Sequence, residues 1–174
     1  QEERFIGPSR EGLLNTLTDA VAQSFEWSWK LVAALQTRNE ADIDLDLWES
    51  LLHGWERAQL TEQKRVLVLN VLKTLPQLKK LAPAGVDLLK RALTEQAKLP
   101  LSCLPLVESA ADTLWDKCVI QSLEQIELND DRLATAINHL SGKVVQVWLH
   151  ALSRRRAEAK DTWDGIPSEY KVRF

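Results

Sequence analysis

Apolar residues recur along most of the chain at intervals of three and four positions, the period that places them on one face of a helix. No segment sustains the alternation of apolar and polar residues that is typical of a half-buried strand. The pattern therefore predicts an all-α fold. We expect about eight helices, over residues 10–23, from 25, from 46, 62–75, 84–98, 105–126, 130–139 and 141–159.

Polar capping residues and prolines predict where several of these helices begin and end. Asp46 followed by Glu49 resembles a capping box, so the third helix is expected to begin there. Thr61 is expected to cap the fourth helix, which is apolar nearly all round and therefore buried. Pro76 and Pro83 should end that helix and leave room for only a short turn between them.

The connections between the helices are short, which indicates consecutive antiparallel hairpins within a single domain over residues 1–174. The string at 46–49 recurs loosely at 113–116, which favours a HEAT-like α-solenoid; an irregular helical bundle is the alternative.

Gly54 lies mid-helix, where it costs about 1 kcal/mol relative to alanine, and a close helix crossing would explain it. Because the chain begins with Gln1 and contains no methionine, we expect it to be a fragment of a longer polypeptide.

Composition narrows the class of protein further. A net charge of −3 argues against general nucleic-acid binding, which requires a basic face. No apolar run approaches the length of a membrane span, so no membrane association is expected. Cys103 and Cys118 are the only cysteines and form no disulfide framework. Two free thiols are typical of a reducing compartment, which predicts a cytoplasmic protein.

Three familiar sites fail on particular residues. The acidic string at 42–46 opens like a calcium loop, but Leu47 stands where the turn glycine belongs and His53 where the last glutamate belongs. Gly142-Lys143 lacks the remainder of a phosphate-binding loop. The cysteines and histidines lack the clustered spacing of a zinc site. We therefore expect no metal and no cofactor, and we interpret His139 and Ser141 as the end of one helix and the cap of the next.

Tryptophans and arginines are the candidate interaction residues. The second helix carries Trp27, Leu31, Ala34 and Leu35 on its apolar stripe, yet Trp29 lies about 200° around the helix from Trp27. Both tryptophans cannot face one core, so one of them is expected to be an exposed interface anchor.

The last helix and the tail supply the other candidates. Arg154, Arg155 and Arg156 form the only dense basic cluster, near the end of the last long helix. Interaction with the helix dipole explains such a cluster, and contact with an acidic partner is the functional alternative. Trp163 lies in a polar tail and is a candidate docking residue.

Several short segments resemble a known family. They are 136–143 (Ala-Ile-Asn-His-Leu-Ser-Gly-Lys), 148–153, 163–167 (Trp-Asp-Gly-Ile-Pro), Gly7-Pro8, and the stretch from Asp46 to Trp55. Together they resemble an uncharacterised helical domain of large bacterial proteins, some with a sirtuin-like domain upstream, implicated in phage defence. The resemblance implies a helical module and transfers no catalytic residue. A sirtuin-like NAD-consuming domain would lie outside these residues, which contain no glycine-rich nucleotide motif.

These observations lead to one function hypothesis and two alternatives. The chain is expected to be a non-catalytic scaffold or sensor region that acts through a protein partner or through the rest of its parent chain. A homo-oligomerisation domain centred on Trp27 or Trp29 is the first alternative. An enzyme with a site assembled from scattered residues such as His53, His139 and Glu108 is the second.

Overall fold

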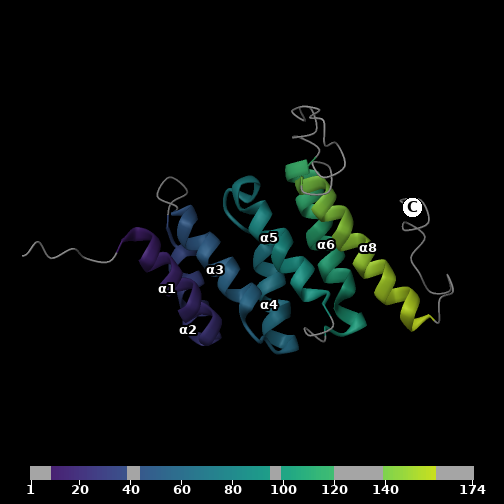
Figure 1. Cartoon of the computed structure of the whole chain (residues 1–174), viewed down its shortest axis with the longest axis horizontal. Coiled ribbons are helices and arrows are strands. Elements are labelled where there is room, and N and C mark those ends of the chain that lie inside the picture. The colour runs from purple at the N-terminus through teal and green to yellow at the C-terminus, as the bar shows by residue number, and fades with distance from the viewer. Residues whose placement is uncertain (1–8, 39–43, 95–98, 120–138, 160–174) are drawn as a thin grey trace, which may run out of the picture. The chain divides into compact units, whose positions relative to one another are not determined.

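The computed structural model describes residues 9–38, 44–94, 99–119 and 139–159 (Figure 1). Every regular element in these ranges is a helix and none is a strand, which confirms the predicted all-α fold. The chain divides into two compact units, one up to Gln59 and the other from Leu60 onward, and each is described by itself. The prediction of one domain stays a prediction, as does the HEAT-like arrangement.

Unit 1 contains three helices. They are α1 (Arg10–Gln23), α2 (Phe25–Gln36) and α3 (Leu45–Arg57). Ser9 caps α1 by accepting a hydrogen bond from the backbone N–H of Gly12, and Ser24 caps α2 by accepting one from Trp27. Both caps follow from the preference of serine for this position, where its hydroxyl satisfies an otherwise unpaired N–H group.

The helix α3 begins two residues earlier than its predicted capping box. Asp44, not Asp46, is its N-cap, and the Asp44 carboxylate accepts from the backbone N–H of Asp46. Both carboxylates also receive hydrogen bonds from the Arg10 guanidinium at 2.8 to 3.0 Å. These carboxylates raise the pKa of Arg10, Asp46 contributing most. This ion-paired group joins the first turn of α1 to the first turn of α3.

Helices α1 and α3 cross closely at Gly54, as its mid-helix position predicted. A Cβ atom at Gly54 would overlap the Val21 side chain and lie 2.8 Å from the carbonyl oxygen of Thr18. Only glycine therefore permits this approach, and the crossing places Trp48, Leu51 and Trp55 of α3 in the core of the unit.

Helix α2 is tied to α3 through tryptophan contacts. The indole Nε1 of Trp55 donates a buried hydrogen bond of 2.9 Å to the hydroxyl of Ser28. The Trp29 ring lies 6.3 Å from the Trp55 ring and stacks on Phe25 at 5.5 Å. A buried indole N–H needs such a partner, so Ser28 is buried for a specific reason. These contacts fix which face of α2 points toward the core.

Unit 2 contains four α-helices and two short helical segments within the described ranges. They are α4 (Glu62–Leu72), α5 (Leu78–Ala92), η3 (Leu101–Cys103), α6 (Leu104–Leu114), η4 (Trp115–Val119) and α8 (Leu140–Glu158). Helices α5, α6 and α8 pack on one another, and α4 packs on α5 and α6. The segment η4 continues α6 as a π-helix, in which the Trp115 ring lies 5.1 Å from that of Trp148 on α8.

Two predictions about α4 and α5 are wrong. Helix α4 is capped by Thr61 as expected, but it is not buried all round, because Leu67 is 42% exposed. Pro83 does not separate two elements: it lies inside α5, which begins six residues earlier than predicted and ends at Ala92. The Pro83 side chain is on the exposed side, while its neighbours Ala82 and Ala84 are buried. Packing of the inner face thus outweighs the cost of an interior proline.

Helix α8 is held to α5 and α6 by polar contacts. Its N-cap is His139, whose Nδ1 accepts from the backbone N–H of Ser141, so the predicted cap at Ser141 is wrong by two residues. Lys143 pairs with Asp87 of α5 at 3.3 Å. Residues 130–138 of the helix predicted over 130–139 lie outside the described residues.

Candidate interaction site

The structure separates the two tryptophans of α2 as their spacing required. Trp29 is half-buried against Phe25 and Trp55, whereas Trp27 is 44% exposed. Trp27 is therefore the anchor candidate, and Trp29 is a packing residue. The sequence established that one of them faces outward but not which one.

The stripe predicted on α2 is mostly an outer face. The residues that α2 buries are Ser28, Val32 and Leu35. Of the predicted stripe only Leu35 is among them: Trp27 and Ala34 are exposed and Leu31 is half-buried. Helical spacing places these last three on one side of α2, and we call them the α2 outer face. Because α2 is apolar on two sides, its periodicity alone cannot identify the buried one.

Two basic residues accompany the α2 outer face. Lys30 lies one turn from both Trp27 and Ala34, and Arg38 follows the end of the helix. Both are exposed, and neither forms an ion pair within the described ranges. Glu26, also exposed, contributes one negative charge beside them. Lys30 was not predicted as a site residue, although its position three residues after Trp27 was a usable signal.

The arginine cluster of α8 is largely engaged inside unit 2. Arg155 forms a bidentate pair with Glu108 of α6, with both hydrogen bonds at 2.9 Å. Arg154 donates to the carbonyl oxygen of Leu99, and Arg156 is half-buried. At least Arg155 and Arg154 therefore stabilise the packing of α8, and their charges are not freely presented to a partner.

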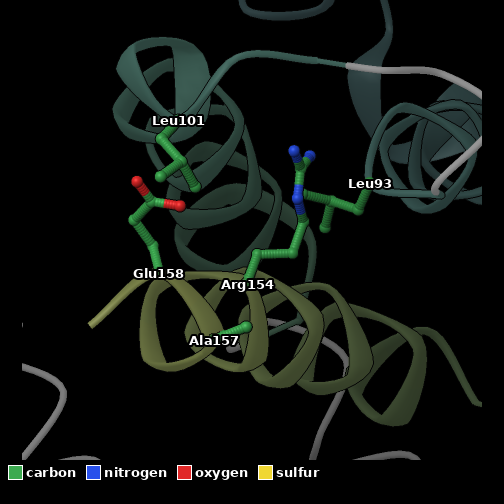
Figure 2. Close-up of a pocket in the computed structure, with 5 residues that line it drawn as sticks. All are labelled: Leu93, Leu101, Arg154, Ala157 and Glu158. Carbon is green, nitrogen blue, oxygen red and sulfur yellow. The ribbon is translucent and has the colours of Figure 1, made fainter. Parts of the chain in front are cut away.

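A pocket of about 450 Å³ lies beside the last turns of α8 (Figure 2). Its lining residues are Leu93, Leu101, Arg154, Ala157 and Glu158. Figure 2 shows Leu101 beside the Glu158 carboxylate and Leu93 beside the Arg154 guanidinium. Among the described residues that line it, there is neither a nucleophile nor a histidine.

The residues of the alternative enzyme site each have a separate structural partner. Glu108 is bound to Arg155, and His139 caps α8. His53 lies on α3 near two carboxylates of its own helix, 3.8 Å from Glu49 and 3.5 Å from Glu56. Across the described residues, no group of three or more His, Cys, Asp or Glu side chains is arranged to hold a metal ion. Trp163 lies outside the described residues.

The two cysteines differ in burial, and we predict a difference in reactivity. Cys118 is buried, which raises the pKa of its thiol, although the charges of Lys79 and Lys117 oppose part of this effect. Cys103 is partly exposed, with its sulfur 3.7 Å from a carboxylate oxygen of Glu62. Because the thiolate is the reactive form, iodoacetamide should modify Cys103 more than about tenfold faster than Cys118 at neutral pH.

Peptide mass spectrometry over a pH series from neutral to alkaline measures both rates. A raised pKa means that the thiolate of Cys118 forms only at higher pH than that of an ordinary thiol, so its modification should accelerate late in the series. Equal rates for the two cysteines at neutral pH would contradict the burial of Cys118.

Comparison with known proteins identified no relative of this chain. No protein-family model matches the chain, and neither a curated protein nor a solved structure matches it. No helix among the described residues is long and apolar enough to cross a membrane.

Proposed function

We propose that this chain is a non-catalytic helical scaffold or sensor region of a larger cytoplasmic bacterial protein, and that it acts through protein–protein contacts. The observation that carries this proposal is the α2 outer face. A soluble helix normally presents polar residues on the side away from its core, and an exposed tryptophan in an apolar stripe is typical of an interface anchor. The resemblance to helical domains of phage-defence proteins supplies the proposed setting.

Site-specific photo-crosslinking in the full-length protein tests the proposal. A photoreactive residue replacing Ala34 on the α2 outer face should give a discrete protein adduct in the native cell. The same residue replacing Lys80, an exposed position on α5, is the matched control. The adduct from position 34 should disappear in the Trp27→Ala variant, because that change removes the anchor while leaving an exposed site.

The crosslinking result also separates the proposal from the oligomerisation alternative. An adduct between two copies of the chain would assign the α2 outer face to self-association. Indistinguishable adducts from positions 34 and 80, or an adduct that persists without Trp27, would contradict a specific contact at this face.

A further inference from the structure

The α2 outer face has the dimensions and spacing of one side of a helix–helix interface. With 12 residues, α2 is about 18 Å long, which is enough for three turns of a partner helix. Trp27, Leu31 and Ala34 follow the i, i+4, i+7 spacing with which helices interdigitate. The small Ala34 side chain allows a close approach at one end, and the large Trp27 ring offers contact area at the other.

The charges beside this face indicate the chemistry of its partner. Lys30 and Arg38 bring two exposed cations without ion-pair partners in the described ranges, against the single carboxylate of Glu26. Among the described residues of this segment, positive charge therefore exceeds negative charge, in a chain whose net charge is −3. An apolar stripe edged by cations is complementary to an apolar stripe edged by carboxylates.

We infer that the α2 outer face binds an amphipathic helix with acidic flanks. Its apolar stripe packs on Trp27, Leu31 and Ala34, and its carboxylates pair with Lys30 and Arg38. The inference rests on the proposed function and names the class of partner. A second copy of this chain fits less well, because two identical faces would bring together four cations and only two carboxylates.

A designed peptide tests this inference directly. The probe is a fluorescent helical peptide with one leucine stripe flanked by glutamates, and its pair carries lysines in place of the glutamates. Fluorescence anisotropy with the full chain should show binding of the glutamate peptide, weakened at least about tenfold by raising salt or by switching to the lysine peptide. The contact covers one short helix face, so we expect weak affinity.

Variants with matched controls locate the contact. Trp27→Ala should weaken binding of the glutamate peptide at least about tenfold, whereas Leu67→Ala, at an exposed leucine of α4, should leave it unchanged. The double charge reversal Lys30→Glu with Arg38→Glu should weaken binding similarly and should now favour the lysine peptide. Charge reversal at two other exposed lysines, Lys79→Glu with Lys80→Glu, changes the total charge by the same amount and should have little effect on peptide binding.

Each contrary outcome identifies what is wrong. Equal affinity for both peptides would overturn the acidic partner while leaving a protein contact at this face intact. Failure of the glutamate peptide to bind at millimolar concentration would also overturn the acidic partner. The crosslinking test of the proposed function would be unaffected by this result. Concentration-dependent self-association that requires Trp27 would replace the partner with a second copy. Stronger binding of the chain to anionic phosphatidylserine vesicles than to the peptide would assign the face to a membrane surface.

Discussion

Replacing Gly54 with alanine should lower the free energy of unfolding of unit 1 by about 2 kcal/mol. The new Cβ would meet two unyielding neighbours, the Cβ and Cγ1 atoms of Val21 and the backbone oxygen of Thr18. Overpacking of rigid atoms costs up to about 3 kcal/mol, and the better helix propensity of alanine returns about 1 kcal/mol. The loss should appear as a lower midpoint in urea unfolding.

Hydrogen exchange shows whether the effect is local. Amide protons of α1 and α3 should exchange faster in the variant, because the helices must separate to admit the methyl group. The matched control is Gly85→Ala in α5, where the new atom would meet a terminal methyl carbon of the Leu72 side chain, at 3.3 Å. That side chain can adjust, so the control should change stability by less than about 1 kcal/mol. Equal losses for both variants would contradict a special crossing at Gly54.

The two sides of this crossing show how far the sequence could predict the fold. Glycine in the middle of a helical pattern is unfavourable locally, so the sequence indicated a close contact at Gly54. It contained no indication that the contacting residues would be Thr18 and Val21 of α1, because contacts between distant segments depend on how whole helices pack. The cap at Thr61 was predicted correctly, because a cap depends only on neighbouring residues.

The incorrect predictions arose where two local signals competed. Asp44 and Asp46 are both good N-cap residues two positions apart, and the bond between the Asp44 side chain and the Asp46 N–H decides between them. Pro83 is normally a helix breaker, but it lies on the exposed side of a helix whose other side is well buried. At Asp44 the outcome is set by a local hydrogen bond, whereas at Pro83 it is set by tertiary contacts that no short window of sequence contains.

The candidate site was predictable only in part. The 200° separation of Trp27 and Trp29 required one of them to face away from the core. The choice depends on Ser28, whose hydroxyl accepts from the Trp55 indole and thereby turns that side of α2 inward. For the arginine cluster, no local pattern indicated that Arg155 would pair with Glu108, which lies 47 positions earlier on α6.

Removing the Glu108 carboxylate should strongly destabilise unit 2. The side chains of Arg155 and Glu108 are only 18% and 13% exposed, and their two hydrogen bonds join α8 to α6. Glu108→Ala takes away this bidentate partner and leaves a largely buried cation, which costs about 3 kcal/mol. Urea unfolding measures the loss, and faster hydrogen exchange in α6 and α8 locates it.

A double variant distinguishes the net contribution of the Arg155–Glu108 pair to stability from the cost of removing one partner only. Glu108→Leu combined with Arg155→Met removes both charges and keeps apolar volume, so it should recover most of the stability lost in Glu108→Ala. The exposed pair between Arg57 and Asp19, 3.5 Å apart with both side chains about 65% exposed, is the comparison in unit 1. Asp19→Ala should cost less than about 0.5 kcal/mol, because solvent screens that pair.

The same experiment decides whether Arg155 is structural or reserved for a partner. If Arg155 were held for an external anion, Glu108→Ala would cost little stability and would increase binding of acidic peptides to α8. If it holds α8 against α6, the variant loses stability and gains no such binding. The bidentate geometry and the burial of both side chains support the second outcome. The acidic partner proposed above would then contact Lys30 and Arg38, the exposed cations beside the α2 outer face, rather than Arg155.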